Sequence, residues 1–96
     1  MSCYFVARIH IEDREEYQKY LDGYDAVFAK YQGQVVAVDD QPTLLEGEWR
    51  HTRLVLIRFP NQEEALRWYD SPEYQELAAH RWRSSYGDIV LVTGRD

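Results

Sequence analysis

Arg81 is the residue whose surroundings most clearly point to ligand chemistry. It follows Tyr74 by seven residues, which is two turns of a helix, so the two side chains share one face. A guanidinium on an apolar helix face needs an anion, because an unpaired charge is costly to bury. Arg81 could hold the carboxylate of a small ligand, with Trp68 and Tyr74 as an apolar wall. Alternatively, it could pair with Asp13 or Glu46 and simply fix the helix.

A carboxylate and an indole flank a glycine in the middle of the chain. Glu46 and Trp49 lie on either side of Gly47, where a loop is predicted over 47–52. Glu46 could act there as a general base or hydrogen-bond acceptor, with Trp49 as an aromatic wall at the mouth of a pocket. Equally, Glu46 could pair with an arginine beside a turn at Gly47. The candidate pocket residues are Tyr4, Glu46, Trp49, Trp68, Tyr74 and Arg81.

The chain shows no pattern for a metal, nucleotide or covalent catalytic site. Its histidines, His10, His51 and His80, lack the H-x-H and H-E-x-x-H spacings that bind zinc. The single cysteine, Cys3, excludes an internal disulfide. Five scattered glycines form no phosphate-binding loop. We therefore expect no metal and no other cofactor.

The charge balance bears on the class of partner. With 11 basic and 17 acidic residues the formal net charge is −6, which would repel a phosphate backbone, so nucleic-acid binding is not expected. The sequence has no basic-then-apolar leader and no run of about 18 apolar residues. We expect one domain over residues 1–96, cytoplasmic and without a membrane segment.

Periodicity predicts the elements that position these side chains. Large apolar residues from Tyr17 to Tyr31 recur at steps of three and four, which indicates a helix. Asp13 is suited to cap its start, and Glu16 would complete a capping box with it. Gly33 is placed to end the helix in a left-handed cap.

The second half of the chain repeats the plan of the first. Asn61-Gln-Glu-Glu64 matches Asp13-Arg-Glu-Glu16 at an offset of 48 residues. Ser71-Pro72 then interrupts the helix, because proline suits the first turn of a new helix and not the interior of an old one. The pattern predicts strands over 3–11, 34–38, 53–59 and 88–93, an extended segment over 43–46, a first helix between Asp13 and Gly33, and further helices over 62–69 and from 72 to about 85.

This β-α-β-β-α-β order predicts an α+β protein with the ferredoxin-like fold, a four-stranded antiparallel sheet with helices on one face. Three of the strands are nevertheless apolar on both faces, whereas a half-solvated antiparallel sheet should alternate. We therefore expect the open face to pair, sheet to sheet, with a second copy in a homodimer. The predicted dimer face comprises Val6, Arg8, His10, Leu54, Leu56 and Arg58. Its arginines would take acidic partners from the other subunit, with Asp39, Glu46 and Asp88 as candidates.

The chain resembles a known family over almost its entire length, and a string of residues in the second half carries the resemblance most clearly. Phe59-Pro60, Ala65, Trp68-Tyr69, Ser71 to Gln75 and Arg81 form the pattern FP-x4-A-xx-WY-x-SPEYQ-x5-R. The chain is similar to a mainly bacterial family of uncharacterised proteins, a domain of unknown function in the dimeric α/β-barrel superfamily. The resemblance implies a ferredoxin-like subunit that pairs into a barrel-like dimer. That superfamily includes cofactor-independent monooxygenases, muconolactone-type isomerases, haem-dependent chlorite dismutases and stress-response proteins.

Two functions from different classes follow from these observations. The first is a homodimer that binds or transforms a small organic acid or aromatic metabolite, without metal or nucleotide, in a pocket between helices and sheet. The second is a non-catalytic stress-response or interaction protein whose aromatic residues form the core and the dimer interface. The first predicts an open pocket beside Arg81, and the second predicts no cavity larger than a few waters and pairing of Arg81 and Glu46 within the protein.

Overall fold

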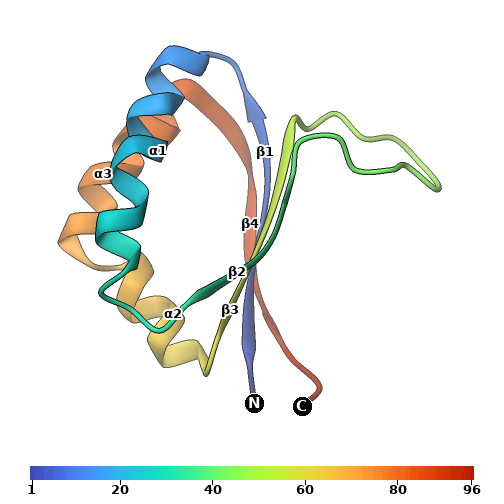
Figure 1. Ribbon diagram of the computed structural model, residues 1–96. Coiled ribbons are helices and arrows are strands. Elements are labelled where there is room, and N and C mark those ends of the chain that lie inside the picture. The colour runs from blue at the N-terminus through green and yellow to red at the C-terminus, as the bar shows by residue number, and fades with distance from the viewer.

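The computed structural model describes residues 1–96 as a four-stranded sheet with its helices on one face (Figure 1). The elements in chain order are β1 (Cys3–Ile11), α1 (Arg14–Phe28), β2 (Gln34–Asp39), β3 (Arg53–Phe59), α2 (Gln62–Tyr69), α3 (Pro72–Ser84) and β4 (Ser85–Thr93). The strand order across the sheet is β2-β3-β1-β4, and all neighbouring strands are antiparallel. The predicted ferredoxin-like βαββαβ fold is confirmed.

The central strand β1 alternates between the two faces of the sheet. Phe5, Ala7 and Ile9 are buried under the helices, whereas Arg8 between them is exposed. This alternation follows from the strand geometry, in which successive side chains point to opposite faces. Phe5 pairs with Ile57 of β3, which is also buried. The odd-numbered residues of both strands therefore face the core.

Each helix begins at a side-chain cap, and the cap at Asp13 was predicted from the sequence. Asp13 accepts hydrogen bonds from the amides of Glu15 and Glu16 at 3.1 and 3.2 Å. Asn61 caps α2 through the amide of Glu64 at 2.8 Å. The hydroxyl of Ser71 accepts from the amide of Tyr74 at 3.1 Å and caps α3, with Pro72 in the first turn. These caps satisfy amides that have no partner within their own helix.

Two predictions about α1 are wrong. The helix ends at Phe28 with a right-handed cap at Ala29, and Gly33 does not adopt a left-handed conformation. The capping box is also incomplete, because the amide of Asp13 donates to the carbonyl of Ser84 at 3.0 Å. The carboxylate of Glu16 is therefore available for contacts with α3, described below.

The core lies between the helices and the sheet, and Trp68 is at its centre. Trp68 is fully buried, and its ring centroid lies 4.3 Å from that of Tyr74 and 5.2 Å from that of Phe5. The ring of Phe59 lies 5.5 Å away on β3. Burying an aromatic side chain of this size is a large stabilising contribution, so Trp68 ties α2 and α3 to the sheet.

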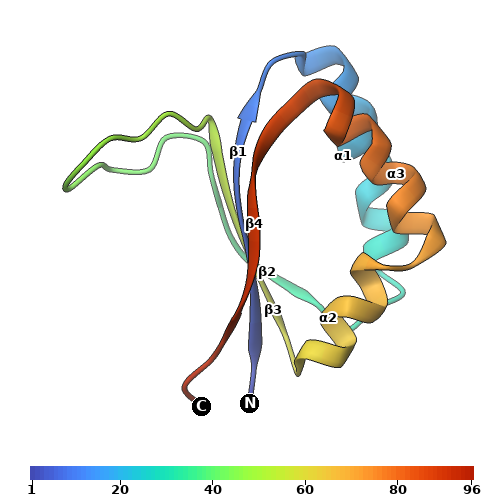
Figure 2. The same cartoon turned by 180° about the vertical axis from the view of Figure 1, so that it is seen from behind.

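Residues 40–52, between β2 and β3, form no helix or strand, and we call this segment the arm. It projects from the side of the sheet opposite the helices, as both views show (Figures 1 and 2). The chain bends back at Gly47, whose φ of 83° favours glycine. At the far end of the sheet the two termini meet, where the hydroxyl of Ser2 donates to the carboxylate of Asp96 at 2.8 Å.

Candidate functional site

A cavity of about 70 Å³ lies between the helix layer and the sheet. Its walls are formed by side chains of α1, α3 and all four strands. Nearly all of these side chains are apolar or aromatic. A buried water needs about 10–15 Å³ of such space, so the cavity holds roughly five waters or a compact organic molecule. The lining residues are Phe5, Ala7, Ile9, Tyr17, Tyr20, Leu21, Tyr24, Val35, Arg53, Val55, Ile57, Tyr74, Arg81 and Ile89.

Arg81 brings a positive charge into the wall of this cavity. The residue is only 7% exposed, and its Nε and Nη2 atoms are buried without a hydrogen-bond partner. Its guanidinium carbon lies 5.8 Å from the ring centroid of Tyr20 and 6.0 Å from that of Trp82, which are weak cation–π contacts. The predicted alternative of an ion pair with Asp13 or Glu46 is wrong, because Arg81 makes no ion pair.

Four tyrosines are among the residues that line the cavity. The hydroxyls of Tyr20 and Tyr74 are 2.7 Å apart, and the hydroxyl of Tyr24 is buried without a partner. Burial raises the pKa of Tyr17, Tyr20, Tyr24 and Tyr74 above the usual 10.0. These phenols are therefore neutral at physiological pH and can donate hydrogen bonds to an anion, but they do not act as bases.

The lining also lacks the groups that usually move protons in catalysis. No carboxylate, imidazole, thiol or aliphatic hydroxyl is among the lining side chains. General-base catalysis near neutral pH depends on such groups. The chemistry of the cavity itself is thus that of a binding site for an anion with an apolar body.

A second arginine, Arg53 at the start of β3, lines the same cavity. Its Nη1 atom lies 2.9 Å from a carboxylate oxygen of Asp40 at the base of the arm. Asp40 is half-exposed, so this ion pair is of the surface type that contributes little to stability. Sequence reasoning missed Arg53, although its parity with Val55 and Ile57 on β3 already placed it on the helix side of the sheet.

Only two of the six predicted pocket residues line this cavity. Tyr74 and Arg81 do so, whereas Trp68 is packed within the core beside it. Tyr4 is on β1 and points to the opposite, helix-free face, where it is half-buried. The tyrosines of α1 that line the cavity were assigned from the sequence to a core-facing stripe, because periodicity does not distinguish a packed wall from a hollow one.

Glu46 and Trp49 lie on the arm, apart from Arg81. They line a separate surface hollow of about 240 Å³ together with Leu44, Leu45 and Leu54. Trp49 packs edge-to-face on His51, with ring centroids 5.1 Å apart. Glu46 is therefore not placed to serve as a base for a ligand held by Arg81.

The six residues predicted for a dimer face all lie on the helix-free side of the sheet. Val6, His10, Leu54 and Leu56 are half-buried, and Arg8 and Arg58 are exposed. Within the chain, Arg8 lies 3.0 Å from Asp88, and Arg58 lies 3.5 Å from Asp96. Apart from the segment 42–49 beside Leu54, no element covers the apolar members of this face in the monomer (Figure 2).

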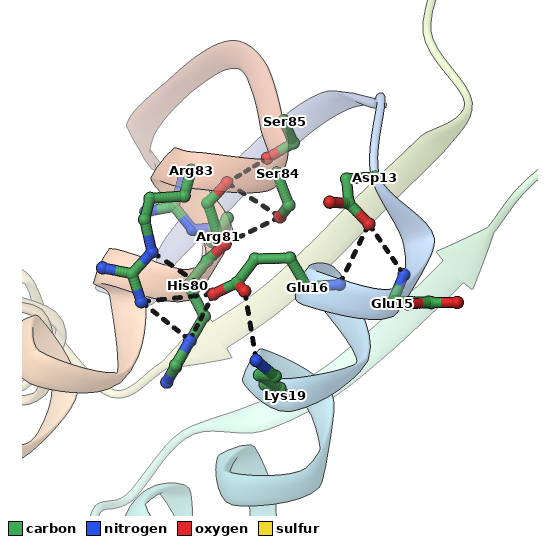
Figure 3. A network of polar contacts seen from close by, with 9 residues as sticks. All are labelled: Asp13, Glu15, Glu16, Lys19, His80, Arg81, Arg83, Ser84 and Ser85. Atoms are coloured by element: carbon green, nitrogen blue, oxygen red, sulfur yellow. Dashed lines mark hydrogen bonds and ion pairs between the residues drawn. The ribbon is translucent and has the colours of Figure 1, made fainter.

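A network of charged residues joins the two helices that carry the cavity tyrosines (Figure 3). The carboxylate of Glu16 on α1 contacts His80 and Arg83 on α3, and Lys19 one turn along α1. The hydrogen bond from His80 is the main reason that the pKa of Glu16 falls to about 2, with Arg83 and Lys19 adding to it. This network fixes α3 beside α1 immediately next to Arg81.

The structure has neither a cluster of metal ligands nor a membrane-spanning helix. No three histidine, cysteine, aspartate or glutamate side chains gather closely enough to hold a metal ion. None of the helices is long and apolar enough to cross a membrane.

Comparison with solved structures finds the same fold in other proteins. RPA0582, a protein of unknown function from Rhodopseudomonas palustris, superposes with a TM-score of 0.81 at 15% identity, over 99% of this chain and 83% of that chain. SnoaB, a cofactor-independent oxygenase from Streptomyces nogalater, gives 0.67 at 22% identity, over 99% and 94%. A dimeric ferredoxin-like protein of unknown function from Thermobifida fusca YX gives 0.66 at 14% identity, over 96% and 88%. At such identities the likeness establishes the fold alone.

Comparison of the sequence with protein families agrees with the resemblance seen in the second half of the chain. No curated protein matches this sequence. A family match, by contrast, extends over residues 2–95, almost the entire chain. The chain therefore belongs to the family described as Domain of unknown function (DUF1330).

Proposed function

We propose that this protein is a homodimer in which each subunit binds a compact organic acid in the cavity between helices and sheet. The observation that carries the proposal is the buried guanidinium of Arg81, which has no acidic partner and faces an apolar cavity. An uncompensated buried charge is costly, and folded proteins normally pair it. An anionic ligand supplies the missing partner.

A carboxylate fits the unpartnered edge of this guanidinium. The two unpartnered atoms, Nε and Nη2, form one edge of the guanidinium plane, and this edge matches the two oxygens of a carboxylate. The buried hydroxyl of Tyr24 offers a further donor. Because Arg53 is already neutralised by Asp40, Arg81 is the one cation of the lining without a counter-charge, which favours a monoanion.

The size of the cavity restricts the apolar part of the ligand. A cavity of about 150 Å³ accommodates benzene, so the 70 Å³ cavity suits an aliphatic acid of a few carbon atoms. An aromatic acid requires the partly exposed Leu21 and Val35 to move aside. Binding, rather than turnover, is the activity that the lining supports best, since it holds no side chain able to take up a proton near neutral pH.

The alternative of a non-catalytic interaction protein predicted no cavity larger than a few waters and pairing of Arg81 and Glu46 within the protein. The two residues are not in contact, and Glu46 lies on the arm. This separation supports ligand binding over a purely structural role for Arg81.

The homodimer is supported by the surface that the monomer leaves uncovered. The accessible surface is 6415 Å², against about 5800 Å² expected for a folded monomer of this mass. Large apolar side chains, including Val90 and Val92 of β4, are about half exposed on the sheet. A standard interface covers about 800 Å² per partner, and the protein from Thermobifida fusca with this fold is described as dimeric.

Matched pairs of acid and amide test the ligand. We expect isobutyrate to raise the melting temperature of the purified protein and isobutyramide to leave it unchanged, because only the acid supplies a charge to Arg81. The variant Arg81→Gln should lose this response, whereas Arg67→Gln, an exposed arginine on α2, should keep it. Titration calorimetry with propionate, isobutyrate and benzoate then ranks the acids by size.

The proposal fails if no acid in this series binds at millimolar concentration, or if Arg81→Gln binds the acids as well as the wild type. Sedimentation velocity tests the dimer: a wild-type protein that stays monomeric at all concentrations contradicts that half of the proposal. The variant Leu56→Asp places a charge on the helix-free face of the sheet and should dissociate a dimer that forms through this face.

A further inference from the structure

The arm is the one segment of the chain that extends well beyond the sheet. It leaves β2 after Asp39, bends at Gly47 and returns to β3 at Arg53. It projects toward the helix-free side, where the proposed second subunit lies (Figures 1 and 2). Any molecule that covers the open face therefore meets the arm.

The backbone amides of the arm make few hydrogen bonds within the chain. No backbone amide of residues 42–51 donates a hydrogen bond within the protein, although the amides of Gln41 and Thr52 at its base do. Near its tip, Leu45 is 88% exposed and Leu44 is 53% exposed. An extended segment with two solvent-facing leucines and unpaired amides has the composition of an interaction surface.

The length of the arm determines what it can reach. Two sheets that pack face to face lie about 10 Å apart, and an extended chain advances about 3.3 Å per residue. The leg from Asp40 to Glu46 therefore spans roughly 20 Å when extended. An arm of this reach passes beyond the plane of a facing sheet, so its tip lies along the side of the partner.

We propose that the arm of each subunit clasps the second copy, with Leu44 and Leu45 packed against the side of the partner's sheet. This inference rests on the homodimer of the proposed function and adds a contact that the sheet faces alone do not provide. Two-fold symmetry makes the contact reciprocal, so both arms are covered in one assembly. A second copy is favoured over a different protein because the arm rises from the same face that carries the uncovered apolar strands.

Side-chain contacts at the base of the arm hold it in its orientation toward the helix-free side. Trp49 packs against His51 and shares a hollow with Leu54 of β3, which anchors the returning leg to the sheet. The imidazole Nδ1 of His10 lies 3.0 Å from the carbonyl of Arg50 and fixes the same leg to β1. The anchored leg leaves the leucines near the tip available for the partner.

The dimer dissociation constant of the full chain tests the clasp, measured by sedimentation velocity over a dilution series. We expect the double variant L44S/L45S to raise this constant at least about tenfold, because it removes two apolar contacts from each arm. The matched control is Trp82→Ser, which removes an exposed aromatic from the outer side of α3 and should leave the constant unchanged. Circular dichroism checks that each variant is folded.

The outcomes separate the clasp from the dimer itself. If Leu56→Asp dissociates the protein while L44S/L45S keeps the wild-type constant, the dimer stands and the clasp is overturned. If the wild type never dimerises, both proposals fall. As an independent readout, a photo-crosslinking residue at position 45 should give crosslinks between subunits, and crosslinks confined to one chain would contradict the clasp.

Discussion

The hydroxyl groups of Tyr20 and Tyr74 lie 2.7 Å apart in the cavity wall and join α1 to α3. Each residue of the pair is at most 7% exposed, so water does not replace a lost partner. A hydrogen bond of this kind contributes about 1 kcal/mol net, and leaving one partner unsatisfied costs a similar amount or more. The pair thus combines a structural role with a place in the wall of the proposed binding site.

Tyr20→Phe and Tyr74→Phe should each lower the free energy of unfolding by about 1–2 kcal/mol, because each change orphans one buried hydroxyl. The double variant should lose less free energy of unfolding than the sum of the two single variants, because no buried hydroxyl is then left without a partner. Urea unfolding of the four proteins closes this double-mutant cycle. Strictly additive costs would show that the two hydroxyls do not depend on each other.

Replacing Arg81 with methionine should stabilise the ligand-free protein. The change removes a buried charge without an acidic partner and keeps much of the apolar volume, so we expect a gain of about 1–3 kcal/mol. The same variant should lose the response to isobutyrate. Calorimetric melting with and without the acid measures both effects, with Arg67→Met as the exposed control. A clear loss of stability would reveal a compensating partner for Arg81 within the chain.

Asp40→Asn should strengthen the binding of acids. The substitution releases Arg53, which lines the cavity, and adds an uncompensated positive charge beside the ligand. Because exposed pairs are worth about 0.2–1 kcal/mol, we expect a gain in affinity of up to about fivefold. Glu48→Gln is the matched control, since it releases Arg50 on the arm and not beside the cavity. Equal affinities for the two variants in titration calorimetry would exclude a role for Arg53.

The Glu16 network makes stability depend on acidic pH. The pKa of Glu16 is about 2 in the folded protein, against 4.5 for an unperturbed carboxyl, chiefly through the hydrogen bond from His80. The unfolded chain therefore takes up a proton first as pH falls. The stabilisation by Glu16 is fully present above pH 4.5 and is lost progressively between 4.5 and 2.

The variant Glu16→Gln should flatten the fall in stability over this acidic range, whereas the neighbouring Glu15→Gln, which makes no ion pair, should keep the wild-type slope. Urea unfolding at a series of pH values measures the slopes. If Glu16→Gln retains the wild-type pH dependence, the contacts from His80 and Arg83 do not hold in solution.

Gly87 on β4 tolerates no side chain. A Cβ atom at this position would lie 2.1 Å from the carbonyl oxygen of Arg8 on the paired strand. Because backbone atoms cannot easily move aside, Gly87→Ala should cost about 2–4 kcal/mol. Gly47→Ala at the bend of the arm meets nothing within 4 Å and should cost only about 1 kcal/mol, through its φ of 83°. Similar thermal destabilisation of both variants would contradict this difference.

The local features of the fold were readable from the sequence. Asp13 was identified as a helix cap, and the match of residues 61–64 to residues 13–16 and the Ser71-Pro72 pair marked the starts of the other two helices, because a helix start depends on residues within one turn of it. Phe5, Ala7 and Ile9 necessarily share one face of β1 because strand geometry has a period of two. Both signals are short-range, so they survive without knowledge of the rest of the molecule.

The end of α1 and the partner of Glu16 escaped this reasoning. Gly33 is a common terminator, but the helix ended earlier at Phe28. Glu16 fitted a capping box, but His80 and Arg83, far along the chain, took its carboxylate instead. Contacts between distant segments competed with the local pattern and prevailed.

The sequence by itself determined the ferredoxin-like order of elements and the open, apolar face of the sheet. Only the tertiary structure decided which aromatic residues pack solidly, as Trp68 does, and which line a cavity, as Tyr20 and Tyr74 do. It also decided that Arg81 has no acidic partner. Periodicity assigns a side chain to a face, but an empty volume or an ion pair depends on distances between elements that are remote in sequence.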